Sequence, residues 1–228
     1  MALIKLGQDP ESDDGKSPTV CLDDENDNYV LQGWKLDPKR QEQMDIPAHE
    51  TAIDTVPTLE DRLRACTRSA IHLEMRDGYM RSAPSFVAWQ NGTGDDQAEF
   101  DPVKRPWLRL ISDIVAKGVE VRRARIVSEP VSEYIRFEHQ ATPGNVAAGE
   151  QVRWLPRRHA SRLALPGNDF WLFDDSSVLF YYFTGDGEVP PEPEDEEFVE
   201  DPAVVKFCVD AFEAVWALGT DHSEYVLR

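Results

Sequence analysis

The sequence predicts a mixed α/β fold in which a strand–helix–strand unit and a β-hairpin are flanked by helices, after a small β-rich subdomain. Segments 119–127 and 151–157 are strand candidates on either side of a helical segment, and such a unit implies parallel pairing. The apolar segment 170–183 is interrupted by Asp-Asp-Ser-Ser, which predicts a hairpin turn. Apolar residues at helical spacing after Pro106 and after Asp201-Pro202 predict flanking helices.

The chain before Pro57 is predicted to have two parts. Residues 1–17 are polar and predict a disordered N-terminus, whereas residues 18–57 predict a small β-rich module. Within that module we expect a short helix at 37–44 and strands at 19–24, 29–36 and 50–56. So short a segment builds little core of its own, and the main domain is therefore predicted over residues 58–228.

Two elements open the predicted main domain. Thr58 is expected to cap a helix that carries Leu59, Leu63, Cys66 and Ala70 at helical spacing. The following segment, IHLEMRDGYM, alternates in the manner of a strand with one buried face. Its buried residues would be Ile71, Leu73 and Met75, and its polar face would carry His72, Glu74 and Arg76.

The later elements are expected in the following order. A loop at 91–103 precedes the helix from Pro106, which ends at Gly118, and the strand 119–127 follows. Ser128 is expected to cap a helix with Pro130 in its first turn and with Val131, Tyr134, Ile135 and Glu138 on one face. Pro143-Gly144 would end that helix, before the strand at 151–157, the hairpin, an acidic loop at 186–201 and the last helix.

Negative charge is concentrated in two segments of this acidic chain. The net charge is −19, of which residues 1–60 carry −9 and residues 186–201, with nine acidic and no basic residues, carry −9. The remainder is nearly neutral, and direct nucleic-acid binding is disfavoured because phosphate contacts need a basic face. Seven arginines could still form a positive patch or pair with nearby glutamates: Arg122, Arg123, Arg125, Arg153, Arg157, Arg158 and Arg162.

The sequence predicts a cytoplasmic protein without membrane association. Its start reaches Asp and Glu before any apolar run of signal-peptide length, and no stretch approaches eighteen uncharged apolar residues. Cys21, Cys66 and Cys208 lie far apart without CxxC spacing, which argues against a disulfide framework and a zinc site. GxGxxG, GxxxxGK, GxSxG and HExxH motifs do not occur, so we expect no cofactor and no metal.

Charged residues lie beside apolar ones from residue 117 to residue 175. Because a core excludes Arg and Glu unless they are paired, this pattern indicates either a buried ionic network or a lined pocket. The candidate binding cluster comprises Arg76, Tyr79, Arg125, Glu129, Tyr134, Arg136, Glu138 and Asp174. A wider charged set adds Glu150, Asp169 and Asp175. Two carboxylates of such a set, held about 5–10 Å apart, could perform acid/base chemistry.

Several motifs resemble an actinobacterial family that is known as a domain of unknown function. They include LRACTRSAIHLEMRDGY, PWLRLI, SEPVSEYIRFE, NVAAGE, FWLFDD and DPAVVKF, and the resemblance covers most of residues 58–228. SPTVCLDDENDNYVLQGWKLD is similar to a small module of related actinobacterial proteins. The resemblance implies genes that lie beside those of helix-turn-helix regulators.

The strand–helix–strand unit followed by an apolar strand and Asp also resembles half of a phospholipase-D-like fold. The chemistry of that superfamily needs a His with Lys two residues later and a downstream Asp. None of His49, His72, His139, His159 and His222 has Lys at that position. The resemblance therefore implies a degenerate, non-catalytic relative, and function does not follow from the fold alone.

Three functional hypotheses follow. The first is a non-enzymatic regulatory or interaction protein that partners a helix-turn-helix regulator and responds to a small molecule at the candidate cluster. The second is a phosphodiesterase-like or glycosidase-like hydrolase that uses Glu129, Glu138 and Asp174. The third is an acidic mimic of DNA that occupies the basic groove of a regulator. The sequence favours the first and leaves the oligomeric state open.

Overall fold

The computed structural model describes residues 57–93, 105–191 and 193–228, together with the backbones of five strands closer to the N-terminus. By its internal contacts the chain divides into two units, Met1–Thr58 and Leu59–Arg228. In the first unit, β1 (Leu3–Gln8), β2 (Thr19–Asp23) and β3 (Tyr29–Gln32) form an antiparallel sheet. β4 (Trp34–Lys35) and β5 (Ile53–Asp54) form a second, two-stranded sheet.

Strand β1 lies inside the segment for which the sequence predicted disorder. Its residues LIKLGQ supply enough apolar character to pair with β2, and the polar composition of residues 9–17 obscured that signal. The strands expected at 19–24 and 50–56 are confirmed by β2 and by the shorter β5, whereas the strand expected at 29–36 is divided into β3 and β4, which belong to different sheets. The helix expected at 37–44 lies outside the described residues.

The second unit is built on a seven-stranded mixed sheet with the order β11-β10-β9-β6-β7-β8-β12. At its centre, β6 (Ser69–Glu74), β7 (Glu120–Val127) and β8 (Gln151–Pro156) run parallel, and the strand–helix–strand pattern predicted the β7–β8 pair. β9 (Phe170–Phe173) and β10 (Ser177–Tyr181) form the predicted hairpin. β11 (Glu196–Val199) and β12 (Thr220–Asp221) pair antiparallel at the two edges.

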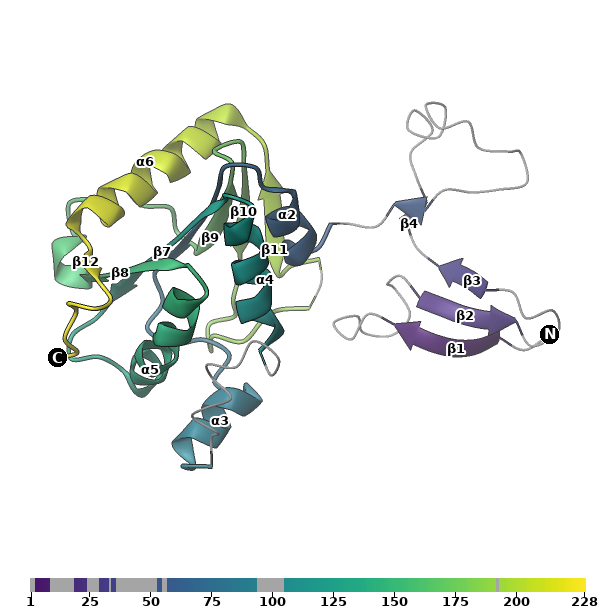
Figure 1. Ribbon diagram of the computed structural model, residues 1–228, viewed down its shortest axis with the longest axis horizontal. Coiled ribbons are helices and arrows are strands. Elements are labelled where there is room, and N and C mark those ends of the chain that lie inside the picture. The colour runs from purple at the N-terminus through teal and green to yellow at the C-terminus, as the bar shows by residue number, and fades with distance from the viewer. Residues whose placement is uncertain are drawn as a thin grey trace. The chain divides into compact units, whose positions relative to one another are not determined.

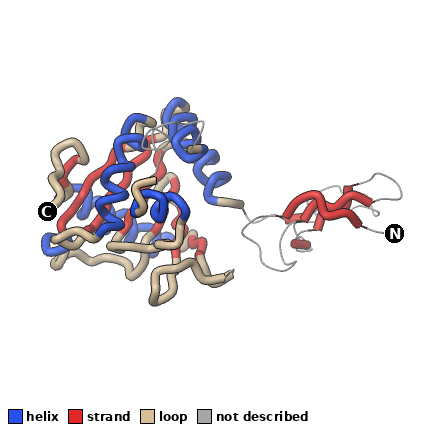
Figure 2. The backbone as a smooth tube through the Cα atoms, turned by 90° about the horizontal axis from the view of Figure 1, so that it is seen from below, coloured by secondary structure: helices blue, strands red, loops and turns tan. Residues whose placement is uncertain are grey.

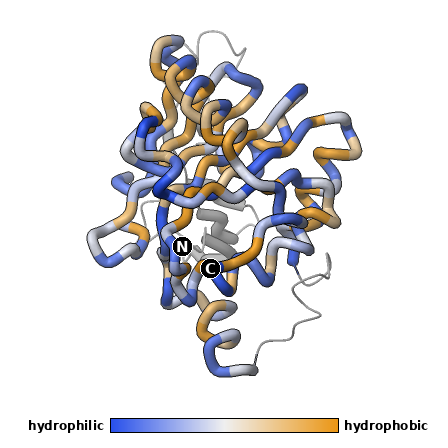
Figure 3. The backbone as a smooth tube through the Cα atoms, turned by 90° about the vertical axis from the view of Figure 1, so that its left-hand side faces the viewer, coloured by the Kyte–Doolittle hydropathy of each residue, from blue (hydrophilic) through white to orange (hydrophobic). Residues whose placement is uncertain are grey.

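Helices cover both faces of this sheet (Figure 1; Figure 2). α6 (Pro202–Leu218) packs on one face through Val205, Cys208, Phe212 and Val215. The other face is covered by α2 (Leu59–Ala65), α4 (Pro106–Ala116) and α5 (Glu133–Ala147), and α3 (Pro84–Gln90) adds Phe86 to the cluster around α5. Hydrophobic and hydrophilic residues are interspersed along the backbone (Figure 3).

The helix ends of α4 and α6 agree with the sequence prediction. α4 begins at Pro106, and Gly118 beyond its end has φ of +93°, a conformation that glycine adopts most readily. Asp201 caps α6 by accepting hydrogen bonds from the amides of Ala203 and Val204. Among the described residues, no helix is both long and apolar enough to span a bilayer.

Strand β6 corrects the prediction of one buried and one polar face. All six of its residues are buried, including His72 and Glu74, because helices cover the central strands on both sides. Met75 and Arg76, which the prediction included in the strand, follow its end. Alternation in the sequence therefore reported the two faces of the strand correctly but not their exposure.

Two helices differ from their predicted limits. α2 ends at Ala65, and Ala70 lies in β6. α5 begins at Glu133 rather than after Ser128, because the hydroxyl of Ser132 accepts a hydrogen bond from the Ile135 amide and caps it.

α5 also continues through Pro143-Gly144 to Ala147. A proline inside a helix usually costs about 3 kcal/mol, and the residues around it, Ala141, Thr142, Gly144 and Asn145, are buried.

Two loop predictions also need correction. The acidic segment 186–201 includes β11, which pairs with β10 from Glu196 to Val199, so this segment is not a loop throughout. Phe198 of that strand is exposed, and the guanidinium of Arg62 lies 3.7 Å from the centre of its ring. The sequence did not predict α3, whose seven residues are too few for a clear helical period. Residues 94–103 of the loop expected at 91–103 lie outside the described ranges.

Candidate functional site

The sheet face beneath α4 and α5 carries charged residues at its centre. Glu74 of β6 lies opposite Arg125 of β7, and His72 lies opposite Arg123. Side chains two residues apart on a strand point to the same face, so Arg123 and Arg125 necessarily share it. Glu74 is 2% exposed and Arg125 is 3% exposed, which is unusual for groups that remain charged.

These residues form a buried ionic network with glutamates from α5 and the segment after it. Arg123 donates to Glu150 Oε1 over 2.6 Å and to Glu74 Oε1 over 2.9 Å. Arg125 Nη1 lies 2.5 Å from Glu74 Oε2, and Arg125 Nη2 donates to Glu138 Oε2 over 2.6 Å. The ionic network is defined here as Glu74, Arg123, Arg125, Glu138 and Glu150.

Neutral groups complete the surroundings of the ionic network. Asn145 Nδ2 donates to Glu150 Oε2 over 2.7 Å, which occupies the second oxygen of that buried carboxylate. The guanidinium of Arg125 stands 5.6 Å from the centre of the Trp154 ring. Its Nε is buried without a hydrogen-bond partner. The ionic network is therefore held mainly by its ion pairs and to a lesser extent by contacts with neutral groups.

His72 is a neutral member of this face. Its ring stacks on Trp171 with 4.3 Å between ring centres, and its Nδ1 lies 3.2 Å from Glu74 Oε1. Burial lowers the pKa of His72 well below its usual value, and the charges of Arg123 and Arg125 lower it further. His72 therefore stays uncharged at neutral pH, and its position is structural.

Two tyrosines adjoin the charged residues. The rings of Tyr79 and Tyr134 lie 5.1 Å apart. Burial raises the pKa of the Tyr79 hydroxyl, and the charges of Glu74 and Glu138 raise it further. Burial likewise raises the pKa of Tyr134. Both hydroxyls keep their protons throughout the physiological range.

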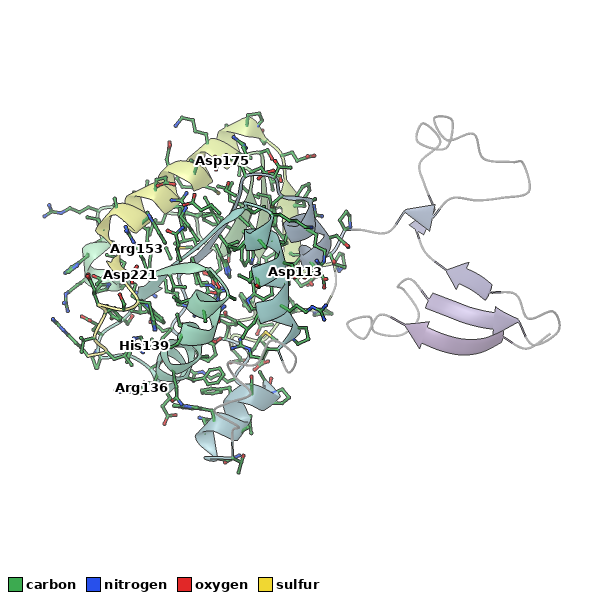
Figure 4. All side chains as sticks on the ribbon, viewed as in Figure 1. Asp113, Arg136, His139, Arg153, Asp175 and Asp221 are labelled. Atoms are coloured by element: carbon green, nitrogen blue, oxygen red, sulfur yellow. The ribbon has the colours of Figure 1, made fainter. Side chains whose placement is uncertain are left out.

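The structure brings together four of the eight residues in the candidate cluster. Arg125 and Glu138 form an ion pair, and Tyr79 and Tyr134 pack against each other close enough to influence Arg125 electrostatically. Arg76 lies at the margin of this group, because its guanidinium stands 4.9 Å from the centre of the Phe183 ring, which itself lies 5.0 Å from the Tyr79 ring. Arg136 is exposed on the outer side of α5 (Figure 4).

Glu129 lies in a separate environment. Its Oε2 lies 2.6 Å from Arg158 Nη1, and its Oε1 accepts a hydrogen bond from the Tyr225 hydroxyl over 3.2 Å. Neither partner belongs to the ionic network. The segment after β8 and the C-terminal segment therefore hold Glu129, which lies in the loop after β7.

Asp174 organises the connection between α2 and β6. Its Oδ1 accepts from the amides of Arg68 and Ser69, and its Oδ2 accepts from the amide and hydroxyl of Thr67. Burial opposes ionisation, but the hydrogen bonds from these three residues outweigh it and lower the pKa of Asp174. With φ of +49°, Asp174 also forms the β9–β10 turn. Its role is structural.

The three residues of the wider set have different roles. Glu150 belongs to the ionic network, whereas Asp175 is exposed in the β9–β10 turn. Asp169 is buried, and its Oδ1 accepts from the Met75 amide over 2.7 Å. Burial, together with the charge of Glu74, raises the pKa of Asp169 to about 6.

A second polar cluster at the ends of the parallel strands escaped the sequence analysis. Asp77 accepts from the amide and the hydroxyl of Ser128, each over 2.6 Å, and lies 3.1 Å from Arg157 Nη2. Arg157 also donates to the carbonyl of Ile126. The sequence did contain a signal for this cluster, namely the position of its residues. Asp77, Ser128 and Arg157 follow β6, β7 and β8, and the carboxyl ends of parallel strands meet at one edge of a sheet.

Most of the arginines considered for a positive patch have internal acidic partners. Arg122 pairs with Glu213 over 2.8 Å, and Arg153 donates to the carbonyl of Trp216. Within the described part of the chain, no three His, Cys, Asp or Glu residues are placed to hold a metal ion. Cys66 and Cys208 are buried thiols, and burial raises the pKa of Cys66 to about 12, so it is a poor nucleophile.

Comparison with known protein families identifies the family to which the second unit belongs. The family model described as "Domain of unknown function (DUF6879)" matches residues 57–227. The chain belongs to this family. The DUF6879 domain thus comprises the seven-stranded sheet, its covering helices and the ionic network. Curated proteins include no match to the chain.

Solved structures similar to this chain share little sequence identity with it. Nuc, a phospholipase D family member from Salmonella typhimurium, is 12% identical with a TM-score of 0.42, over 71% of this chain and 86% of its own. NucT from Helicobacter pylori is 11% identical with a TM-score of 0.41, over 72% and 87%.

The archaeal chromatin protein TrmBL2 is also similar, at 12% identity and a TM-score of 0.39, over 70% of this chain and 47% of its own. The mixed α/β fold class is confirmed by the sheet itself.

Proposed function

We propose that this DUF6879 protein is a non-enzymatic regulatory protein that binds a helix-turn-helix transcription regulator. The observation that supports this proposal most strongly is the pairing of every charged member of the ionic network inside the domain. Residues that looked like a reactive or ligand-binding set are used to hold β6, β7 and α5 together. We therefore assign the function to the surface of the domain and to the acidic segments.

Catalysis by the ionic network would require its pairs to separate. Each of Glu74, Glu138 and Glu150 has an arginine nitrogen within 2.5–2.9 Å. Breaking a buried ion pair costs about 3–5 kcal/mol, because the remaining charge stays desolvated. A substrate phosphate would have to supply that energy before any chemistry began. The paired state therefore favours a scaffold over a reaction centre.

A hydrolase that uses Glu129, Glu138 and Asp174 has no support in the geometry. The three carboxylates have different partners, namely Arg158 with Tyr225, Arg125, and the Thr67–Ser69 segment. Within the ranges that the structure describes, no side chain bridges one of these carboxylates to another. An acid/base pair must act on one substrate bond from two sides, and three separately engaged carboxylates do not provide that arrangement.

The net charge of the chain supports a DNA-binding protein as its partner. The chain carries a net charge of −19, and DNA-binding proteins present basic surfaces to phosphates. Opposite net charges accelerate encounter and select partners, although they add less to the final affinity. The resemblance to a family encoded beside helix-turn-helix regulators narrows the class to those proteins. A small molecule that binds the Tyr79–Tyr134 region would make the interaction ligand-responsive.

A DNA-binding assay tests this function. Labelled operator DNA is saturated with the regulator encoded beside this protein, and the full chain is titrated in up to about 50 µM. We expect the mobility of the complex to change, because the protein joins it or alters its affinity for DNA. Release of free DNA would instead favour the acidic mimic. An unrelated helix-turn-helix regulator is the control, and an unchanged complex would contradict the proposal.

A further inference from the structure

The C-terminal residues Thr220–Arg228, named here the C-terminal strap, cover one edge of the sheet. β12 pairs with β8 at this edge, and the amide of His222 donates to the carbonyl of Val152 over 2.9 Å. At the far end of the strap, the carbonyl of Arg228 accepts from the amide of Val131 over 2.9 Å. The strap is thus attached to β8 and to the loop before α5.

Two histidines lie where the strap meets α5 and β8. The indole Nε1 of Trp154 donates to His222 Nδ1 over 3.1 Å, and Nε2 of His139 lies 3.3 Å from the Tyr225 carbonyl. The two imidazole rings are 4.6 Å apart. The Tyr225 ring stacks on Trp154 at 5.7 Å with 5° between the planes. Figure 4 labels His139 near the edge that carries Arg153 and Asp221.

These partners define the protonation state of each histidine. An indole N–H can only donate, so His222 Nδ1 must be unprotonated for this contact to exist. A backbone carbonyl can only accept, so His139 carries its proton on Nε2. Adding a proton to His222 Nδ1 turns it to a donor that faces the Trp154 donor. It also places a positive charge 4.6 Å from His139.

We propose that the C-terminal strap is a pH-responsive closure, held on β8 while His222 is neutral and released when His222 is protonated. Each element that packs against the histidine pair contributes to this balance. α5 contributes His139, and the strap itself contributes Asp221. The further charged groups that surround the strap are Arg153 on β8, Glu129 before α5, Arg158 after β8, and Glu224 and Arg228 in the strap.

The direction of the effect follows from the environment of the pair. Burial lowers the pKa of His222 from its ordinary value of 6.5, and His139 lowers it further, while Asp221 opposes them. Burial also lowers the pKa of His139, against the hydrogen bond to Tyr225. The closed strap therefore binds fewer protons than the open one. Its stability is complete above pH 6.5 and declines as the pH falls below that value.

Opening the strap changes which groups the domain presents. Trp154 is fully buried, and the departure of Tyr225 and His222 would expose its ring. β8 would lose its pairing with β12 and become an edge strand. Unpaired strand edges accept further strands from other chains. Acidification would thus turn a covered edge into one that can pair.

Hydrogen exchange followed by mass spectrometry on the full chain tests this proposal. Exchange is compared from pH 7.5 to 5.0 after correction for the intrinsic pH dependence, in a peptide that covers the strap. We expect the protection of this peptide to fall several-fold as the pH drops below 6.5, because the open strap then binds protons that the closed strap does not. Peptides from β6 and β7 are the internal reference and should not change.

Variants make the test specific to His222. In His222→Asn the side-chain oxygen can accept from Trp154 without titrating, so the loss of protection should shrink to less than about twofold. His139→Gln keeps a donor for Tyr225 but removes the second charge, so opening should move to lower pH. His159→Asn is the control for the loss of an exposed imidazole outside the strap. The asparagine oxygen can still accept from Arg158 Nε, as His159 Nε2 does over 3.2 Å, so this variant should behave as wild type.

Two results would overturn the proposal. One is constant protection of the strap in the wild-type chain from pH 7.5 to 5.0. The other is a full loss of protection in His222→Asn, because the titrating group would then lie elsewhere. Circular dichroism confirms that each variant is folded. If His222→Asn does not fold, the proposal is tested with His139→Gln, in which the loss of protection should move to lower pH. A loss of protection at the wild-type pH in that variant counts against the proposal.

Discussion

Replacing Arg125 with methionine tests whether the ionic network stabilises the fold. Arg125 holds Glu74 at 2.5 Å and Glu138 at 2.6 Å, and Glu74 is almost completely buried. Methionine has a similar length but no charge, so both carboxylates lose a partner. Arg123 still pairs with Glu74, and the Glu138 side chain is 18% exposed, which relieves part of the penalty.

We expect the free energy of unfolding to fall by about 4 kcal/mol, the usual cost of removing one partner of a buried ion pair. Most domains are stable by only about 5–15 kcal/mol, so this loss is readily measured. Urea unfolding followed by circular dichroism gives the value, and an unchanged slope indicates that the unfolded states are comparable. Adding Glu138→Gln should recover about 1 kcal/mol by removing an unpaired charge.

An exposed pair provides the matched control. Arg64 and Glu60 lie 2.8 Å apart on α2, with side chains 42% and 57% exposed, and Arg64→Met should cost less than about 1 kcal/mol. A loss below about 1 kcal/mol in Arg125→Met as well would refute the scaffold interpretation, since the buried charges would then contribute no more than surface ones.

Three further predictions concern other positions. Asp174→Asn should lower the free energy of unfolding by about 2 kcal/mol, because one charged acceptor of several hydrogen bonds is lost, while the exposed Asp175→Asn should change it by less than about 0.5 kcal/mol in the same urea titration.

The pKa of Asp169 is raised from 3.8 to about 6, so between these pH values the native state keeps a proton that the unfolded state has lost. This group therefore lowers the free energy of unfolding as the pH rises from 4 to 6. Asp169→Asn should therefore be more stable than wild type by about 1–3 kcal/mol at pH 7.5 and equal to it near pH 4, and a gain independent of pH would contradict this. Gly149→Ala should lower the melting temperature more than Gly118→Ala. Both glycines have positive φ, but only a Cβ at Gly149 would lie 2.8 Å from Val115 Cγ1. Equal losses in the two variants would show that this contact is unimportant.

The sequence predicted best the elements whose signal is local. Pro106 and Gly118 define both ends of α4, and Asp201 defines the start of α6, because capping depends on residues within one turn. The β9–β10 hairpin was predictable from its turn residues. The start of α5 was misplaced because Ser128 and Ser132 are both suitable caps, and only contacts with Asp77 decide between them.

The ionic network was predictable only in part, because its geometry depends on register between distant strands. Arg125 and Glu138 are thirteen residues apart and were grouped correctly. Glu74 was assigned to an exposed face, since nothing near β6 in the sequence shows that α4 and α5 cover it. Asp174 was included for its charge, although its partners lie more than a hundred residues earlier in the chain.

Isothermal titration calorimetry of the full chain with a purified helix-turn-helix regulator, the partner class proposed above, tests the central claim most directly. We predict a saturable complex with a dissociation constant of about 10 µM or tighter, which weakens as salt is raised from about 0.05 to 0.3 M. Absence of binding under these conditions, together with turnover of a phosphodiester or glycoside that Glu138→Gln abolishes in a folded protein, would contradict the account.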